Sequence, residues 1–203
     1  MPVDTLDLVF MEQHVAHTKA AWRKRAQSKA WEEKIHRTHR PRGRGDRVSD
    51  ARWLEVEDDL ASAADHFGKA VELFGRGGFD ADDISGYAAR MAFLHSMFSA
   101  HTSLESGLNR TLAILGEDRP SGERWHEDLI RRVSREISGQ RPAIFDAETA
   151  DLADQTRRFR HIAVESYNHF KPQEAATAVA AAAALAERIL PVFARFRAAI
   201  DPA

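Results

Sequence analysis

Residues 82–115, DDISGYAARMAFLHSMFSAHTSLESGLNRTLAIL, form a long stretch of the chain with one continuous helical pattern. Its large apolar side chains recur mostly at intervals of three or four residues: Ile84, Tyr87, Met91, Leu94, Phe98, Leu104, Leu108, Leu112 and Leu115. This spacing gathers them on one face of an α-helix, whereas a half-buried strand would alternate apolar and polar residues. Gly116 and Pro120 follow and are typical helix breakers. The stretch therefore predicts a long helix that packs on other elements.

The segment before this helix carries the same pattern. Ser49 and Asp50 can cap a helix that runs through Trp53 to Phe74 and ends at the glycines of 75–78. Apolar residues again recur at intervals of three and four. A second helix is therefore predicted directly upstream of the first.

Three more helices are predicted downstream, over residues 121–137, 148–170 and 172–200. Ser121 can cap the first of them. Pro172 suits the first turn of the last, and Pro191 is expected to kink it. No alternating strand pattern and no hairpin signal is found in the sequence. We therefore predict an all-α protein, an antiparallel helical bundle with short connections.

Composition narrows the class of protein. The chain has 203 residues, of which 43% are hydrophobic, so it can bury a core. It has no cysteine, which excludes disulfides, thiolate metal ligands and cysteine nucleophiles. Residues 1–12 lack the basic start of a secretory signal, and the most apolar run, Ala175–Ala186, is shorter than the roughly 20 residues of a membrane helix. We expect a cytoplasmic protein without membrane association.

Positive charge is concentrated near the N-terminus. Lys19–Arg47 contains eleven Lys and Arg residues against three acids, although the net charge of the chain is only −2. The stretch RPRGRGDR at 40–47 has the composition of an exposed linker. We therefore predict two parts: residues 1–48, a basic helical arm and linker, and residues 49–203, the helical bundle.

The basic arm interleaves cations with aromatic rings. Arg23, Lys24 and Arg25 lie between Trp22 and Trp31. Such an arm can bind a nucleic-acid backbone while the indoles stack on bases. It can equally bind an acidic partner, or lie as a solvated helix with both indoles buried on the bundle. We take Arg23, Lys24 and Arg25 as candidate RNA-binding residues.

The segment RRFRHIAVESYNH, 157–169, combines cations, imidazoles, a carboxylate and a phenol within one predicted helix. One stripe of that helix holds Arg157, His161, Glu165 and His169, and the neighbouring stripe holds Arg160, Val164 and Tyr167. The plain interpretation is a solvated helix face, where each i, i+4 pair contributes only about 0.2–0.5 kcal/mol. The functional interpretation is a site that handles a phosphodiester.

RNA can be cleaved without a metal ion when one group removes the 2′-hydroxyl proton and a cation stabilises the charge on the phosphorane. Arg160 or Arg157 suits the cation, because a guanidinium can hold two phosphate oxygens. His161 or Glu165 suits the proton acceptor. His169, one turn beyond Glu165, is a candidate contact to the RNA.

Other histidines give weaker signals. Pairs at His14/His17 and His36/His39, and the triplet His161, Glu165 and His169, have spacings that could share a metal ion, but no further ligand completes a set. We therefore predict no metal site. His95 falls in the apolar register of 82–115, which favours a hydrogen-bonded core or interface residue. His126 follows Trp125 near a helix start, and we interpret it as exposed, with phosphate binding at that helix start as the alternative.

The segment from Arg160 to Tyr167 resembles the signature of HEPN domains, in particular the HepT-like ribonuclease toxins. Arg160 matches the arginine of that signature, His161 the polar residue after it and Tyr167 the tyrosine. Further landmarks resemble the same family in the same order: FLHS at 93–96, SGERWHEDLI at 121–130, RP at 141–142 and FRH at 159–161. The resemblance extends over roughly Asp50 to Ile200.

The resemblance implies a HEPN-like bundle and a toxin of a toxin–antitoxin system that cleaves RNA without a metal ion or cofactor. In such domains two subunits place their active segments at a shared cleft, so a homodimer is implied. Arg160 would stabilise the scissile phosphate, and His161 would orient it or assist proton transfer. Tyr167 corresponds to the tyrosine to which a nucleotidyltransferase antitoxin adds AMP in some of these toxins.

Glu165 departs from the family pattern, which has a catalytic histidine at this position. A carboxylate with an ordinary pKa near 4 is a weaker base than an imidazole. Either Glu165 has become the base, or the chain is a catalytically silenced HEPN module that binds RNA or a partner protein. A structural helical bundle without any site is the third class, but it leaves the polar segment unexplained.

Overall fold

The computed structural model describes residues 51–165 and 170–201, with side chains described up to residue 160 in the first range. These residues belong to one compact unit, Ser49–Ala203. The predicted basic arm, with Arg23, Lys24 and Arg25, lies outside the described residues.

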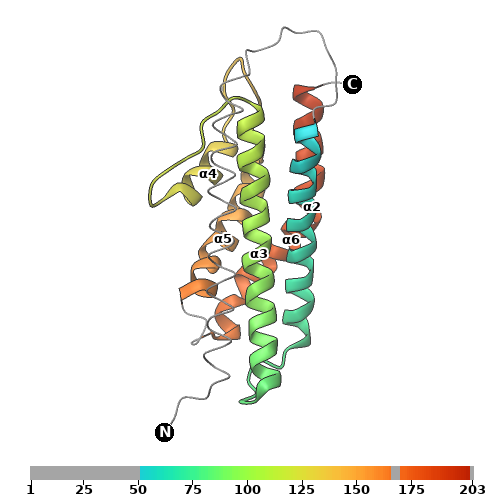
Figure 1. Ribbon diagram of the computed structural model, residues 1–203, viewed down its shortest axis with the longest axis vertical. Coiled ribbons are helices and arrows are strands. Elements are labelled where there is room, and N and C mark those ends of the chain that lie inside the picture. The colour runs from blue at the N-terminus through green and yellow to red at the C-terminus, as the bar shows by residue number, and fades with distance from the viewer. Residues whose placement is uncertain (1–50, 166–169, 202–203) are drawn as a thin grey trace, which may run out of the picture. The chain divides into compact units, whose positions relative to one another are not determined.

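Helices account for most of the described ranges (Figure 1). They are α2 (Ala51–Arg76), α3 (Ile84–Ile114), α4 (Trp125–Val133), α5 (Ala147–Glu165) and α6 (Pro172–Ile200). No strand occurs in these ranges; a single isolated β-bridge joins Ile137 and Arg141. The predicted all-α bundle is confirmed.

The helix α3 lies at the centre of the packing, in contact with α2, α4 and α5, while α6 packs on α2 and α5. In Figure 1, α2 and α3 run side by side along the long axis, joined by a short connection. The side chain of Asp83 caps α3, since its Oδ1 accepts from the backbone N–H groups of Ser85 and Gly86 at 2.9 and 3.0 Å. Gly107 allows the close approach of α2, because a Cβ there would lie 2.8 Å from Cδ2 of Leu60. The central position of α3 lets it contribute side chains to a site shared with α4 and α5.

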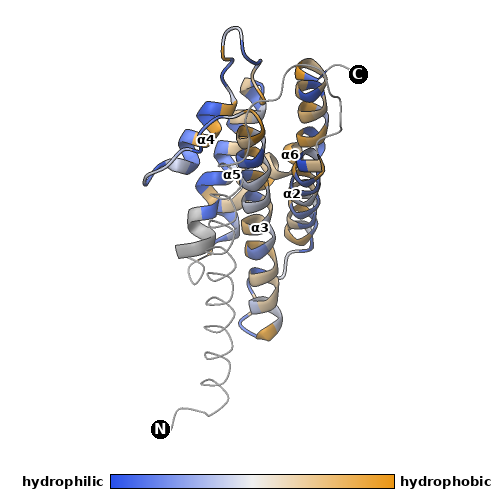
Figure 2. Ribbon diagram, turned by 45° about the horizontal axis from the view of Figure 1, so that its top comes forward, coloured by the Kyte–Doolittle hydropathy of each residue, from blue (hydrophilic) through white to orange (hydrophobic). Residues whose placement is uncertain are grey.

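The helix α4 differs from its prediction. It spans Trp125–Val133, and no side chain caps its first turn. Ser121 therefore does not serve as the predicted cap; it precedes Gly122, whose φ of +91° places a turn before the helix. The predicted end at Ile137 is also too late, because the backbone of Ile137 pairs with Arg141 instead. Figure 2 shows α4 as mostly hydrophilic, in keeping with a short helix at the edge of the bundle.

The helix α6 begins at Pro172, as predicted, and continues on both sides of Pro191. It is long and apolar enough to cross a membrane by length and composition alone. Its buried side chains, however, are part of the bundle core: Ala175, Ala178, Ala181, Ala182, Leu185, Ile189, Val192, Phe193 and Phe196. Core packing therefore accounts for part of its apolar composition.

A cluster of phenylalanine rings fixes the second half of α5. The buried ring of Phe93 on α3 lies 5.7 Å, centroid to centroid, from Phe159 on α5 and 5.4 Å from Phe170. Phe74 and Phe79 complete the cluster at 5.4 and 5.7 Å from the same ring. Because successive helical residues are about 100° apart, burial of Phe159 turns Arg160 away from this cluster.

Candidate functional site

The guanidinium of Arg160 lies partly buried among α3, α4 and α5. Its Nη1 lies 3.4 Å from Nε2 of His126 on α4, and its Cζ lies 5.1 Å from the centroid of the Phe98 ring on α3. Its Nε is buried and has no hydrogen-bond partner in the described part of the chain. A buried donor without an acceptor is costly, so an anion that reached this Nε would stabilise the arginine.

His126 is held on its other side by a carboxylate. Its Nδ1 is hydrogen-bonded to Oε1 of Glu105 on α3, and its ring stacks on Trp125 with centroids 3.6 Å apart. The side chain is 21% exposed. The interpretation of His126 as an exposed residue is therefore wrong, because the contact with Glu105 draws it towards α3.

Glu105 is a buried carboxylate with two imidazole partners. Its Oε1 also lies 3.1 Å from Nε2 of His101, one turn earlier on α3. Burial is the largest influence on the pKa of Glu105 and works to raise it, but the hydrogen bonds and positive charge of His101 and His126 together hold that pKa below its usual value. Glu105 is therefore ionised at neutral pH.

His101 connects this pair to α5. It is fully buried, and its Nδ1 lies 3.3 Å from Oγ1 of Thr156. We call the four linked side chains, His101, Glu105, His126 and Arg160, the polar network. It ties α3, α4 and α5 together through groups that need one another as hydrogen-bond partners.

The charge on Glu105 determines where protons lie in the network. An ionised carboxylate only accepts hydrogen bonds, so Nε2 of His101 and Nδ1 of His126 donate to it. When the imidazole of His126 is neutral, its Nε2 carries the lone pair and accepts from Arg160. No group of three or more His, Asp and Glu side chains in the described ranges is arranged to hold a metal ion. The arrangement suits proton transfer beside a bound anion.

The residues predicted from the polar segment fall into four groups. Arg160 lies in the network. Arg157 does not join it in the described structure, because its Nε donates to Oδ1 of Asp154 at 2.6 Å. His161 and Glu165 lie on α5, but their side chains are outside the described residues. Tyr167 and His169 lie outside them entirely, so their predicted roles remain predictions.

His101 and Glu105 were missed by the sequence reasoning. Their i, i+4 spacing, in register with Leu108 and Leu112 on the buried face of α3, is the signal that could have found them. His95 was predicted to be a core or interface histidine. That prediction is wrong for a core position in this chain, because His95 is exposed and lies 3.4 Å from Oγ of Ser99.

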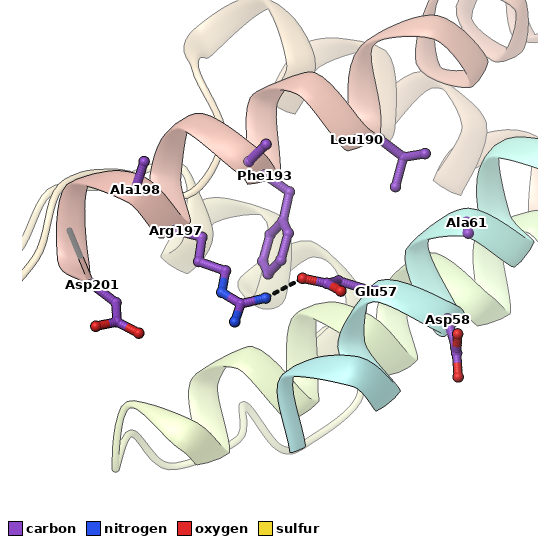
Figure 3. Close-up of a pocket in the computed structure, with 9 residues that line it drawn as sticks. Glu57, Asp58, Ala61, Leu190, Phe193, Arg197, Ala198 and Asp201 are labelled. Carbon is purple, nitrogen blue, oxygen red and sulfur yellow. Dashed lines mark hydrogen bonds and ion pairs between the residues drawn. The ribbon is translucent and has the colours of Figure 1, made fainter. Parts of the chain in front are cut away.

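A separate groove of about 610 Å³ lies between α2 and α6. Figure 3 shows Arg197 of α6 reaching to Glu57 of α2 across it, with the ring of Phe193 beside them. The ion pair joins the two helices, and the groove is lined by none of the network residues. Arg197 and Glu57 satisfy one another across it, which is a feature of a helix–helix contact.

Comparison with known proteins identifies the fold family. A family model described as HepT-like protein matches residues 92–200, more than half of the chain. The chain belongs to the HepT-like family. This is a HEPN-type family, and the match includes most of α3 and all of α4, α5 and α6. Every residue of the polar network in this HepT-like protein therefore lies inside the matched range. No curated protein and no solved structure matched the chain.

Proposed function

We propose that this HepT-like protein is the toxin of a toxin–antitoxin system and cleaves RNA without a metal ion or cofactor. One observation supports this most directly: a partly buried arginine, Arg160, has an unpaired Nε among the described residues and an imidazole lone pair beside Nη1. A cation and a proton acceptor placed side by side are what metal-free RNA cleavage requires.

In the proposed reaction, the 2′-oxygen of the RNA loses its proton and attacks the adjacent phosphorus. The bond from phosphorus to the 5′-oxygen breaks, and the products are a 2′,3′-cyclic phosphate and a 5′-hydroxyl. Arg160 stabilises the negative charge that builds on the phosphorane oxygens. By the resemblance, Glu165 stands at the position of the proton acceptor and His161 orients the phosphate.

The remaining parts of the proposal follow from the same resemblance. The protein acts in the cytoplasm as a homodimer whose two active segments share a cleft. Arg157, His169 and the basic arm contact the RNA. Tyr167 is the residue that a nucleotidyltransferase antitoxin modifies with AMP to block the toxin.

The second candidate function is a catalytically silenced HEPN module that binds RNA or a partner protein. Glu165 favours it, because this residue replaces the histidine of the family signature. A silenced module would retain the anion site at Arg160 but lack an effective base. The two functions therefore differ in turnover rather than in RNA binding.

The decisive experiment is cleavage of a mixed cellular RNA pool by the purified protein in EDTA, with analysis of the product ends. We expect cyclic phosphate ends and a loss of at least about 10²-fold in Arg160→Ala. Arg158→Ala is the matched control, because Arg158 is 72% exposed on the same helix and pairs with Asp154. Equal cleavage by Arg160→Ala, or products without cyclic ends, would contradict the proposal. No cleavage at all, with RNA still bound, would favour the silenced module.

A further inference from the structure

The polar network places a second possible proton acceptor beside Arg160, on a different helix from the signature segment. We propose that His126 removes the 2′-hydroxyl proton and that Glu105 positions it. This inference rests on the proposed RNA cleavage and names its base. It assigns the role to α4 and α3 rather than to position 165.

The hydrogen bonds of His126 fix the tautomer that a general base needs. Glu105 holds the proton on Nδ1, so the lone pair is on Nε2. That lone pair faces Arg160, with Nε2 at 3.4 Å from Nη1. A carboxylate that fixes one ring nitrogen and leaves the other as acceptor is the arrangement by which imidazoles act as general bases.

The position of Nε2 also suits the substrate. The 2′-oxygen of RNA neighbours the phosphorus that it attacks, so the base must lie next to the cation that holds the phosphate. Nε2 of His126 meets this requirement because it contacts Arg160 directly. The ring is 21% exposed, which leaves it accessible to an RNA strand.

Binding of the phosphate would free the lone pair. In the structure, Arg160 donates to Nε2, which is a neutral acceptor at the long distance of 3.4 Å. Phosphate oxygens are charged acceptors and form roughly twice as strong a hydrogen bond, so the guanidinium would turn to them. His126 then becomes available only when a phosphate occupies the site.

The step balances without any further reactant. The proton moves from the 2′-hydroxyl to Nε2 of His126, the 2′-oxygen forms its bond to phosphorus, and the bond from phosphorus to the 5′-oxygen breaks. The leaving 5′-oxygen takes a proton from water, and His126 returns its proton to solvent. Glu105 stabilises the imidazolium that exists between these events.

His101 completes the support of Glu105. It donates to the same Oε1 from the buried side, which leaves Glu105 fixed between two imidazoles. Glu105 and His101 do not touch the reacting atoms, so they are positioning residues. The charge next to His126 comes from Glu105 on α3 and Arg160 on α5.

The test compares single-turnover RNA cleavage in EDTA by the wild-type protein, His126→Ala and Glu105→Gln. We expect His126→Ala to lower the cleavage rate by about 10²- to 10⁴-fold with little change in RNA affinity, and added imidazole to restore part of the rate. Glu105→Gln should lower the rate at least about tenfold. The control, His95→Ala, removes an exposed histidine of α3 and should keep the wild-type rate within about twofold.

A spectroscopic measurement tests whether Glu105 positions His126 or whether Glu105→Gln simply disrupts the structure. Nitrogen-15 NMR of the histidine rings should show His126 with its proton on Nδ1 in the wild-type protein and a mixture of tautomers in folded Glu105→Gln. An unchanged tautomer in that variant would overturn the role of Glu105. Circular dichroism and thermal melting verify that each variant is folded.

Failure of the role assigned to His126 can be told apart from failure of the proposed RNA cleavage. If the wild-type protein is active and Arg160→Ala is not, but His126→Ala cleaves at the wild-type rate, this inference is wrong and the proposed function stands. The inference is also wrong if His126→Ala is folded and inactive but added imidazole restores no activity. A structural role of His126 would then explain the loss, and the proposed function would stand. If the wild-type protein cleaves no RNA, both the proposed function and the role of His126 are wrong.

Discussion

Nη1 of Arg160 lies 3.4 Å from Nε2 of His126, although 34 residues separate them in the chain. The contact joins α5 to α4, and Glu105 extends it to α3. The arginine of the family signature therefore has an imidazole partner from outside that signature. This relationship changes which residues mutagenesis should address first.

The role of position 165 can be tested directly. Because we assign the base to His126, we expect Glu165→Gln to keep the RNA cleavage rate within about threefold of the wild type, since no proton transfer depends on it. Glu165→His should likewise leave an active enzyme. Initial rates on a defined RNA in EDTA provide the measurement. Abolished cleavage in Glu165→Gln would identify Glu165 as the base, and activity that arises only in Glu165→His would identify a silenced enzyme.

Glu105 should make stability depend on pH in the acid range. Its pKa in the folded protein is lower than the usual value of 4.5, so the ionised form stabilises the fold above that pH. The stabilisation is lost as the pH falls through the lower folded-state pKa. Thermal unfolding between about pH 3 and pH 7 should show a steeper acid decline for the wild type than for Glu105→Gln. Glu123→Gln, at an exposed position, should follow the wild-type curve.

Replacing two helical glycines with alanine should change the free energy of unfolding in opposite directions. A Cβ at Gly107 would lie 2.8 Å from Cδ2 of Leu60, so Gly107→Ala should destabilise the fold by about 1–2 kcal/mol after the gain in helix propensity. Gly68 on α2 has nothing within 4 Å of such a Cβ, so Gly68→Ala should stabilise it by up to about 1 kcal/mol. Urea unfolding measures both values. Equal effects would show that the contact between α2 and α3 is looser than described.

Arg141 should be essential to the turns around α4. Its side chain is only 2% exposed, and it donates to Glu117 and to the backbone carbonyl oxygens of Arg135 and Pro142. Arg141→Ala leaves these acceptors unpaired and should cost about 3 kcal/mol in urea unfolding. Arg141→Lys should rescue little, because an ammonium lacks the planar fork of donors. Arg131 is exposed, so Arg131→Ala should change the free energy of unfolding little. An equally small change in Arg141→Ala would contradict the structural role of Arg141.

The basic arm should contribute charge to RNA binding. A triple alanine variant of Arg23, Lys24 and Arg25 is expected to bind RNA more weakly and to lower the slope of log affinity against log salt by about 2, since each phosphate contact on single strands contributes about 0.7. Binding isotherms at several salt concentrations measure the slope. The control is Lys69→Ala/Arg76→Ala, which removes exposed cations of α2. An unchanged slope would show that these three residues do not bind RNA, and would leave an acidic partner or a solvated helix as the role of the arm.

The amino-acid sequence alone determined the all-α class, the place of each long helix and the candidate arginine. These features depend on neighbours in the chain: the apolar spacing along α3, the glycines after Arg76 and Pro172 at the start of α6 are local signals. The resemblance to HepT-like proteins was available for the same reason, since a signature is a local pattern. Where the local signal was weak, at Ser121 before the short helix α4, the predicted helix was too long at both ends.

Only the tertiary structure decided which side chains meet Arg160. His101 and Glu105 look like ordinary positions of an amphipathic helix, and His126 like a surface residue near a helix start. Their contacts depend on how α3, α4 and α5 pack, because hydrogen bonds between residues 21 to 55 positions apart leave no spacing pattern in the chain. Burial then gave Glu105 two imidazole partners and gave His126 a defined tautomer, since buried polar groups must find partners from whichever helix lies opposite.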